Sequence, residues 1–162
     1  MARRGSGSSS AIARTEPPET LGQVLDFMQV LWALDHALTR ASRRMERTLG
    51  ITGPQRLVVR IVGQQPGISA GALARTLRVH PSTLTGVLRR LVERGTIERV
   101  ADPRDARRAL FRLTRAGEKI DAHRTGTVEA RVRAALSGAS ESDIASARRV
   151  LTRLSRALGP ER

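Results

Sequence analysis

The segment from Leu73 to Gly95 constrains the fold of this chain more than any other part of its sequence. Apolar residues recur there at helical spacing in two short runs, which predicts two helices that each bury one face. The runs are Leu73, Ala74 and Leu77, followed by Leu84, Val87, Leu88 and Leu91. Val79 is expected to plug the junction between the helices, and Pro81 suits the first position of the second helix. Two short helices joined by a tight turn predict a helix-turn-helix.

The second of these helices combines small hydroxyl side chains near its start with arginines towards its end. Its predicted exposed residues are Ser82, Thr83, Thr85, Arg89, Arg90 and Arg94. Small hydroxyls can approach base edges closely, a helix N-terminus favours an anion, and arginines further along can contact phosphates beside the groove. The alternative is the solvated face of an ordinary amphipathic helix, and this pattern alone does not decide between the two.

A strongly basic hairpin is predicted directly after the helix-turn-helix. Strands over 97–101 and 109–113 flank a short polar turn. The hairpin carries Arg99, Arg104, Arg107, Arg108 and Arg112. A basic hairpin tip can enter a narrow minor groove, where the negative potential is deepest. Asp105 is expected to hold a neighbouring arginine in place. Next to a helix-turn-helix, this hairpin favours DNA binding over simple solvation of a charged loop.

The remaining sequence predicts helices on both sides of this core. Residues 1–18 are rich in Ser, Gly, Pro and Arg and predict a disordered tail. Residues 19–50 predict one long helix for dimerisation, residues 51–114 a winged helix-turn-helix domain that binds DNA, and residues 115–162 C-terminal dimerisation helices. Within the last segment, one helix is expected from Thr114 to about Leu136. The predicted fold is therefore mainly α-helical with a small β-hairpin wing.

Composition narrows the function further. The net charge is +14, and residues 52–115 hold 13 arginines against four acidic residues, which favours a nucleic-acid partner. Since the chain has no cysteine, disulfides, thiolate metal sites and cysteine nucleophiles are excluded. No cofactor or metal is expected, and no catalytic motif is present, so an enzyme is not predicted. The sequence predicts no membrane span and no signal peptide, hence a cytoplasmic protein.

The sequence also resembles the MarR family of bacterial transcription regulators over residues 20–158. The resemblance rests on LVERGTIERV at the end of the helix-turn-helix, on Asp105-Ala-Arg107 in the wing, and on ALFRLT followed by Gly117. It implies a homodimer with interlocking terminal helices that places two recognition helices in successive major grooves of a pseudo-palindromic duplex. It further implies that Arg107 enters the minor groove, with Asp105 orienting the basic residues around it. Two positions depart from the family pattern, His80 at the cap of the recognition helix and Gly86 within it.

The resemblance also implies a repressor that releases DNA when a small aromatic effector binds. Met28, Trp32 and His36 lie on one face of the first long helix, which borders the ligand crevice in the family, so they are candidate pocket residues. The alternative is that Trp32 packs in a core or a dimer interface. Two other functions stay open: a sequence-tolerant architectural DNA-binding protein, and a ligand-binding or protein-binding dimer that has lost DNA recognition.

Overall fold

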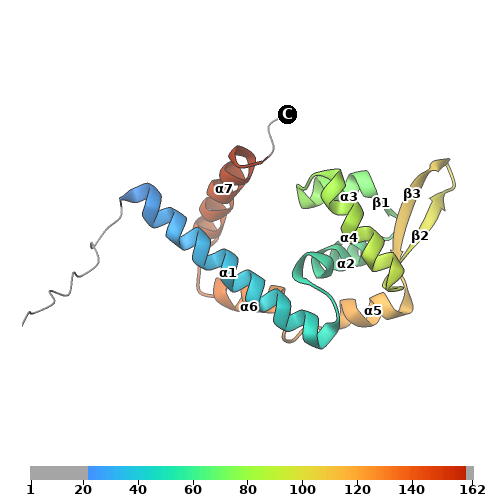
Figure 1. The fold of residues 1–162 in the computed structure, drawn as a ribbon, viewed down its shortest axis with the longest axis horizontal. Coiled ribbons are helices and arrows are strands. Elements are labelled where there is room, and N and C mark those ends of the chain that lie inside the picture. The colour runs from blue at the N-terminus through green and yellow to red at the C-terminus, as the bar shows by residue number, and fades with distance from the viewer. Residues whose placement is uncertain (1–21, 160–162) are drawn as a thin grey trace, which may run out of the picture. The chain divides into compact units, whose positions relative to one another are not determined.

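The computed structural model describes residues 22–159 (Figure 1). The predicted tail, residues 1–18, lies outside the described residues. The described elements are α1 (Gln23–Leu49), α2 (Gly53–Gln64), β1 (Ile68–Ser69), α3 (Ala70–Leu77), α4 (Pro81–Glu93), β2 (Ile97–Asp102), β3 (Asp105–Leu113), α5 (Arg115–Ala122), α6 (Val128–Leu136) and α7 (Glu141–Ala157). The mainly helical fold with a small β-wing is as predicted. No helix within 22–159 is both long and apolar enough to cross a membrane.

The chain divides into two compact units, with the boundary after Asp35 inside α1. In the first unit, the structure describes residues 22–35, and residues 23–35 form the N-terminal part of α1. Large apolar side chains of this part, including Val24 and Trp32, are exposed in the single chain. The second unit contains the rest of α1 and all later elements. The sequence predicts boundaries after residues 50 and 114, which separate dimerisation helices from a DNA-binding domain. Because this division is based on function and not on compactness, it stays a prediction.

Helix α2 begins with a capping box formed by Thr52 and Gln55. The Thr52 hydroxyl accepts a hydrogen bond from the Gln55 amide, and the Thr52 amide donates to Gln55 Oε1 at 2.9 Å. The buried face of α2 includes Val58, Val59 and Val62, whereas Leu57 is 52% exposed. Arg56, the charged residue just before Leu57, is instead buried, and this was not predicted.

The helix-turn-helix forms over α3 and α4 as predicted. Ser69 Oγ accepts a hydrogen bond from the Ala72 amide at 3.3 Å and so caps α3. Leu73, Leu88 and Leu91 belong to one apolar core that also contains residues from α2 and the sheet. Val79 does not plug the turn, because its side chain is 38% exposed and its backbone amide instead donates to the Ala74 carbonyl at 3.1 Å.

The sheet has three antiparallel strands in the order β1-β3-β2, one more strand than the predicted hairpin. Ile68 in β1 pairs with Phe111 in β3, and both side chains are buried. Strand β3 also begins at residue 105, four residues before its predicted start. The prediction relied on apolar residues, and the residues near the hairpin tip are mostly polar. Backbone hydrogen bonds between the strands do not require apolar side chains, so the strand extends further than the apolar pattern indicates.

One long helix was expected from Thr114 to Leu136, and this prediction is wrong. The structure has two helices, α5 and α6, separated by residues 123–127. Gly126 adopts a left-handed conformation with φ of +68°, which interrupts a right-handed helix. Thr127 then starts α6, because its hydroxyl accepts a hydrogen bond from the Ala130 amide at 3.2 Å. The Thr-Gly-Thr sequence at 125–127 is the signal that periodicity alone missed.

Candidate nucleic-acid interface

Helix α4 is held by its apolar face and leaves its polar face in solvent. Leu84, Leu88 and Leu91 are buried in the core beneath it. The predicted contact residues Ser82, Thr83, Thr85, Arg89, Arg90 and Arg94 are all exposed. Burial of every third or fourth side chain therefore fixes which edge of the helix a partner molecule can reach.

Local hydrogen bonds order several side chains on this exposed face. The Thr85 hydroxyl donates to the Pro81 carbonyl at 2.9 Å, and Arg90 Nε donates to the Gly86 carbonyl at 3.2 Å. Arg89 Nε lies 3.8 Å from Glu93 Oε1, with both side chains mostly exposed. An exposed ion pair of this kind contributes little to stability, so Arg89 can exchange Glu93 for another anion at small cost.

His80 forms the N-terminal cap of α4. Its Nδ1 atom accepts a hydrogen bond from the Ser82 amide at 3.3 Å and lies 2.7 Å from Ser82 Oγ. Nδ1 can accept this hydrogen bond only in the tautomer that carries the ring proton on Nε2. An imidazole thus takes the place of the hydroxyl or carboxylate that usually caps a helix.

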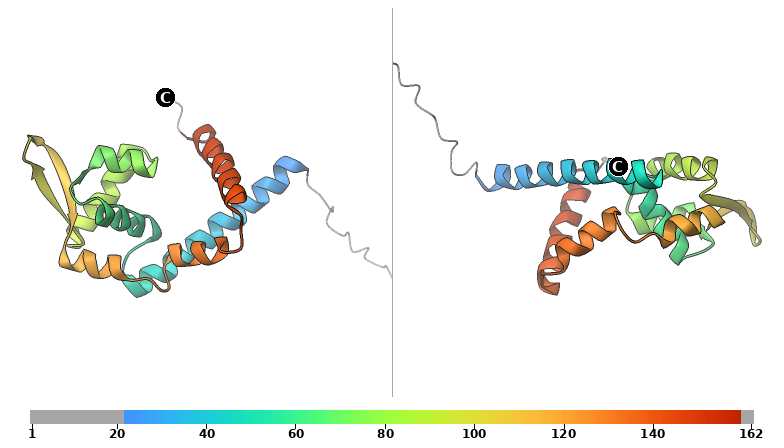
Figure 2. Two further views of the ribbon diagram at one scale, coloured as in Figure 1. Left: turned by 180° about the vertical axis from the view of Figure 1, so that it is seen from behind. Right: turned by 90° about the horizontal axis from the view of Figure 1, so that it is seen from below.

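The wing is braced at its tip by two aspartates that bind backbone amides. Figures 1 and 2 show the β2–β3 hairpin extending away from helices α4 and α5. Asp102 Oδ1 accepts a hydrogen bond from the Arg104 amide, and Asp105 Oδ1 accepts one from the Arg107 amide, both at 3.0 Å. Asp105 therefore positions Arg107 through its main chain. The side chains of Arg104 and Arg107 are exposed.

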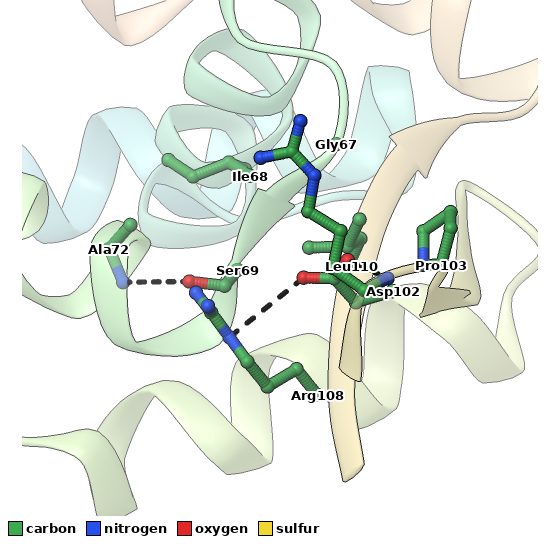
Figure 3. Close-up of a pocket in the computed structure, with 9 residues that line it drawn as sticks. Gly67, Ile68, Ser69, Ala72, Asp102, Pro103, Arg108 and Leu110 are labelled. Atoms are coloured by element: carbon green, nitrogen blue, oxygen red, sulfur yellow. Dashed lines mark hydrogen bonds and ion pairs between the residues drawn. The ribbon is translucent and has the colours of Figure 1, made fainter. Parts of the chain in front are cut away.

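A hollow lies between the wing, including its turn at residues 102–104, and β1 with the start of α3 (Figure 3). Arg108 lines this hollow, and its Nε atom lies 4.0 Å from Asp102 Oδ2. Ser69, the cap of α3, faces it from the other side. Arg108 is still exposed, so Arg104, Arg107 and Arg108 all remain accessible to solvent. The exposed edge of α4 and the wing tip thus both stay accessible.

The predicted effector residues all lie on α1, and all three are exposed in the single chain. Met28 and Trp32 belong to the first unit and His36 to the second. Their role in a pocket stays a prediction.

The chain is similar in sequence and in structure to known transcription regulators. The sequence profile described as "MarR family" matches residues 51–109, which include the helix-turn-helix and most of the wing. A solved structure described as a probable transcriptional regulator from Pseudomonas aeruginosa is 32% identical and has a TM-score of 0.56, with 80% of this chain and 98% of that chain covered. This chain belongs to the MarR family. The family consists of transcription regulators rather than enzymes.

Two further relatives extend the MarR comparison. The regulator TtmR of Methylorubrum extorquens is 31% identical over 118 residues, which cover 72% of this chain and 60% of TtmR. The chain thus spans little more than half the length of the curated relatives it matches. The structure of the S. aureus MepR–DNA complex is 22% identical, with a TM-score of 0.67 over 82% of this chain and 98% of MepR, and shares its fold.

Proposed function

We propose that this MarR-family protein is a homodimeric transcriptional repressor that binds a pseudo-palindromic DNA duplex. The observation that carries the proposal is the exposed polar edge of α4 beside a wing whose arginines stay solvent-accessible. At the wing tip, Asp102 and Asp105 use carboxylate oxygens to bind backbone amides of Arg104 and Arg107. The guanidinium groups are thereby presented to a polyanion on an ordered turn. A DNA-binding role also agrees with the expected cytoplasmic location.

The interface residues divide by their chemistry. Arg89, Arg90 and Arg108 are assigned to phosphates, because guanidinium groups bind phosphate oxygens in any sequence. Ser82, Thr83 and Thr85 are assigned to base edges, because they lie near the start of the recognition helix and are short enough for close approach. Arg107 is assigned to the minor groove and Arg94 and Arg104 to flanking backbone. Phosphate contacts should give steep salt dependence, and hydroxyl contacts should give sequence preference.

Apolar side chains on the terminal helices support a dimer. In the described chain, large apolar residues are exposed on α1, α6 and α7 and at Leu158 directly after α7. They include Val24, Leu25, Met28, Val30, Trp32, Val132, Leu136, Val150, Leu151 and Leu158. Exposed apolar surface of this extent is typical of an interface between chains. A two-fold dimer would place its half-sites about 34–36 Å apart, one turn of the duplex.

Gel-shift and anisotropy titrations with the DNA upstream of the protein's own gene test this proposal. Nanomolar binding that survives excess random duplex at physiological salt is the expected result. No shift, even at low salt, would contradict DNA binding. A sequence-tolerant architectural protein is the second candidate, favoured by the net charge of +14, and equal competition by random duplex would support it instead.

Release by a small aromatic effector is part of the same proposal. It is supported by the MarR membership and by the exposed Trp32 and Met28 on α1. A screen of aromatic acids for loss of the DNA complex tests it directly. If no compound in the screen weakens DNA binding, effector release is contradicted while DNA binding is not.

A further inference from the structure

Arg56 is a buried arginine on α2 that contacts two helices distant in sequence. Its side chain is 2% exposed, and its Nε atom donates to Glu129 Oε1 on α6 at 2.7 Å. The two terminal nitrogens donate to backbone carbonyls at the end of α5. These acceptors are Ile120, Asp121 at 3.4 Å and His123 at 2.6 Å. One guanidinium therefore joins the C-terminal end of α5 to the first turn of α6.

The physical chemistry of this contact makes it hard to replace. Carbonyl groups in the last turn of a helix lack partners within the helix, and a cation there interacts favourably with the helix dipole. Burial alone would raise the pKa of Glu129, but a backbone hydrogen bond, the hydrogen bond from Arg56 and its positive charge together lower it below the usual value. Loss of Glu129 leaves the buried charge of Arg56 without its carboxylate partner, whereas the Glu129 side chain is 35% exposed and remains partly solvated without Arg56. The planar five-donor geometry of arginine fits this set of acceptors, and lysine does not.

The junction held by Arg56 lies between α5 and α6. Residues 123–127 include Gly126 at φ +68° and the buried Thr127. One turn along α2, Arg60 pairs with Asp121 at 2.7 Å. At its N-terminal end α2 contacts α1, since the Gly53 amide donates to Ser42 Oγ at 2.7 Å. Within the second unit, side-chain hydrogen bonds and ion pairs therefore connect α2 to α1, α5 and α6.

We propose that Arg56 is a positioning residue that fixes the orientation of the winged helix-turn-helix relative to α6 and thereby sets the half-site spacing the dimer accepts. This inference rests on the proposed dimeric DNA-binding function. In a dimer joined through its terminal helices, the angle at residues 123–127 determines the separation of the two α4 helices. A rigid angle accepts one operator spacing, whereas a loose angle accepts several. Glu129 acts with Arg56 as the second half of the contact.

The first experiment measures spacing selectivity. Affinity is compared for duplexes that carry the same half-sites at the optimal spacing and with two base pairs inserted, a rotation of about 70°. The wild-type protein should lose at least about tenfold in affinity, whereas Arg56→Met/Glu129→Leu should lose less than about threefold. Val59→Ala is the matched control, because Val59 is fully buried on the same helix within the apolar core. It should be less stable yet keep the wild-type ratio.

The second experiment reads the geometry without DNA. The chain has no cysteine, so Glu93→Cys places one spin label on each exposed α4 of the dimer. The label-to-label distance should be narrowly distributed in the wild-type background and in Val59→Ala. The distance distribution should broaden in Arg56→Lys, in Glu129→Gln and in Arg56→Met/Glu129→Leu. If the double variant is unfolded, the two milder single substitutions still test the proposal.

These outcomes separate the two proposals. An unchanged spacing ratio and a narrow distance in folded Arg56 variants would overturn the positioning role while leaving DNA binding intact. Equal loss of affinity at both spacings would also overturn it, because that result indicates destabilisation alone. A wild-type protein that binds no duplex would instead contradict the proposed function, and the spacing role with it.

Discussion

Gly117 on α5 packs so closely against Thr96 that a Cβ atom at position 117 would lie 2.1 Å from the Thr96 carbonyl oxygen. Thr114 stabilises this contact through its hydroxyl group. The hydroxyl donates to the carbonyls of Gly95 and Thr96 and accepts a hydrogen bond from the Gly117 amide at 3.1 Å. Helix α5 thus begins against the turn that joins α4 to the wing. Only glycine permits this approach, since the obstructing atom belongs to the backbone and has no rotamer to change.

We expect Gly117→Ala to destabilise the protein by about 3 kcal/mol, because the backbone of α5 or of the turn must shift. Thermal unfolding followed by circular dichroism should show a melting temperature lower by about 10 °C. Gly86→Ala is the control. Its Cβ would meet only Arg90 Nη2 at 3.7 Å, and removing a helical glycine should stabilise α4 by about 1 kcal/mol. Equal effects of the two substitutions would contradict the close contact.

Arg107→Ala and Thr83→Ala should weaken DNA binding in different ways. Loss of the Arg107 charge should lower affinity for all duplexes and reduce the slope of log affinity against log salt by about 1. Loss of the Thr83 hydroxyl should leave that slope unchanged and alter preference among operator variants by about 1 kcal/mol. Anisotropy titrations at several salt concentrations check both. If Thr83→Ala weakened every sequence equally, its assignment to base edges would be wrong.

His80→Ala should remove the cap of α4 and cost about 1 kcal/mol of stability. His80→Asn keeps an acceptor oxygen for the Ser82 amide and should retain most of that stability. Thermal unfolding of both variants, followed by circular dichroism, checks this prediction. Equal losses of stability in His80→Ala and His80→Asn would contradict the capping role of the acceptor at position 80.

Glu129 should make stability depend on acidic pH. Its pKa is lowered in the folded state from the ordinary value of 4.5, with burial opposed by hydrogen bonds and the charge of Arg56. A lowered carboxyl pKa contributes stability that is fully present above the unfolded-state value and is lost as the pH falls through the folded-state value. Glu129→Gln should flatten the fall in melting temperature below about pH 4.5. A variant that loses stability on acidification as steeply as the wild type would exclude this contribution.

Trp32 offers a direct choice between an effector pocket and a dimer interface. It is the only tryptophan in the chain and is 71% exposed in the single chain. If it lines the pocket, aromatic acids that release DNA should quench its fluorescence in the dimer. If it packs between subunits, dilution below the dimer dissociation constant should shift its emission to longer wavelength without ligand. An effector that releases DNA and leaves the emission unchanged would remove Trp32 from the pocket.

Capping motifs and apolar periodicity predicted much of the local structure. Thr52, Ser69 and Ser140 have the short hydroxyl side chains that favour helix N-caps, and each of them caps a helix. Helix α4 begins at Pro81, as predicted. These signals involve residues within one helical turn of each other, so their energetics are present in the sequence itself. The accessible edge of α4 follows from the same periodicity, because the spacing of leucines determines the face that is buried.

Features that depend on contacts distant along the chain required the tertiary structure. Strand β1 forms because Ile68 meets Phe111, and α5 ends where Arg56 binds its carbonyls, 64 to 67 residues away in sequence. A charged residue such as arginine is expected at the surface when only its neighbours in sequence are considered. The periodicity of the apolar residues in α2 therefore gives no indication that Arg56 is buried. The sequence by itself therefore determined most of the helices, their caps and the polar edge of α4 that the proposed function assigns to a duplex. Only the tertiary structure decided where the winged domain is joined to the C-terminal helices, because burial and pairing of a charge depend on groups that folding brings together.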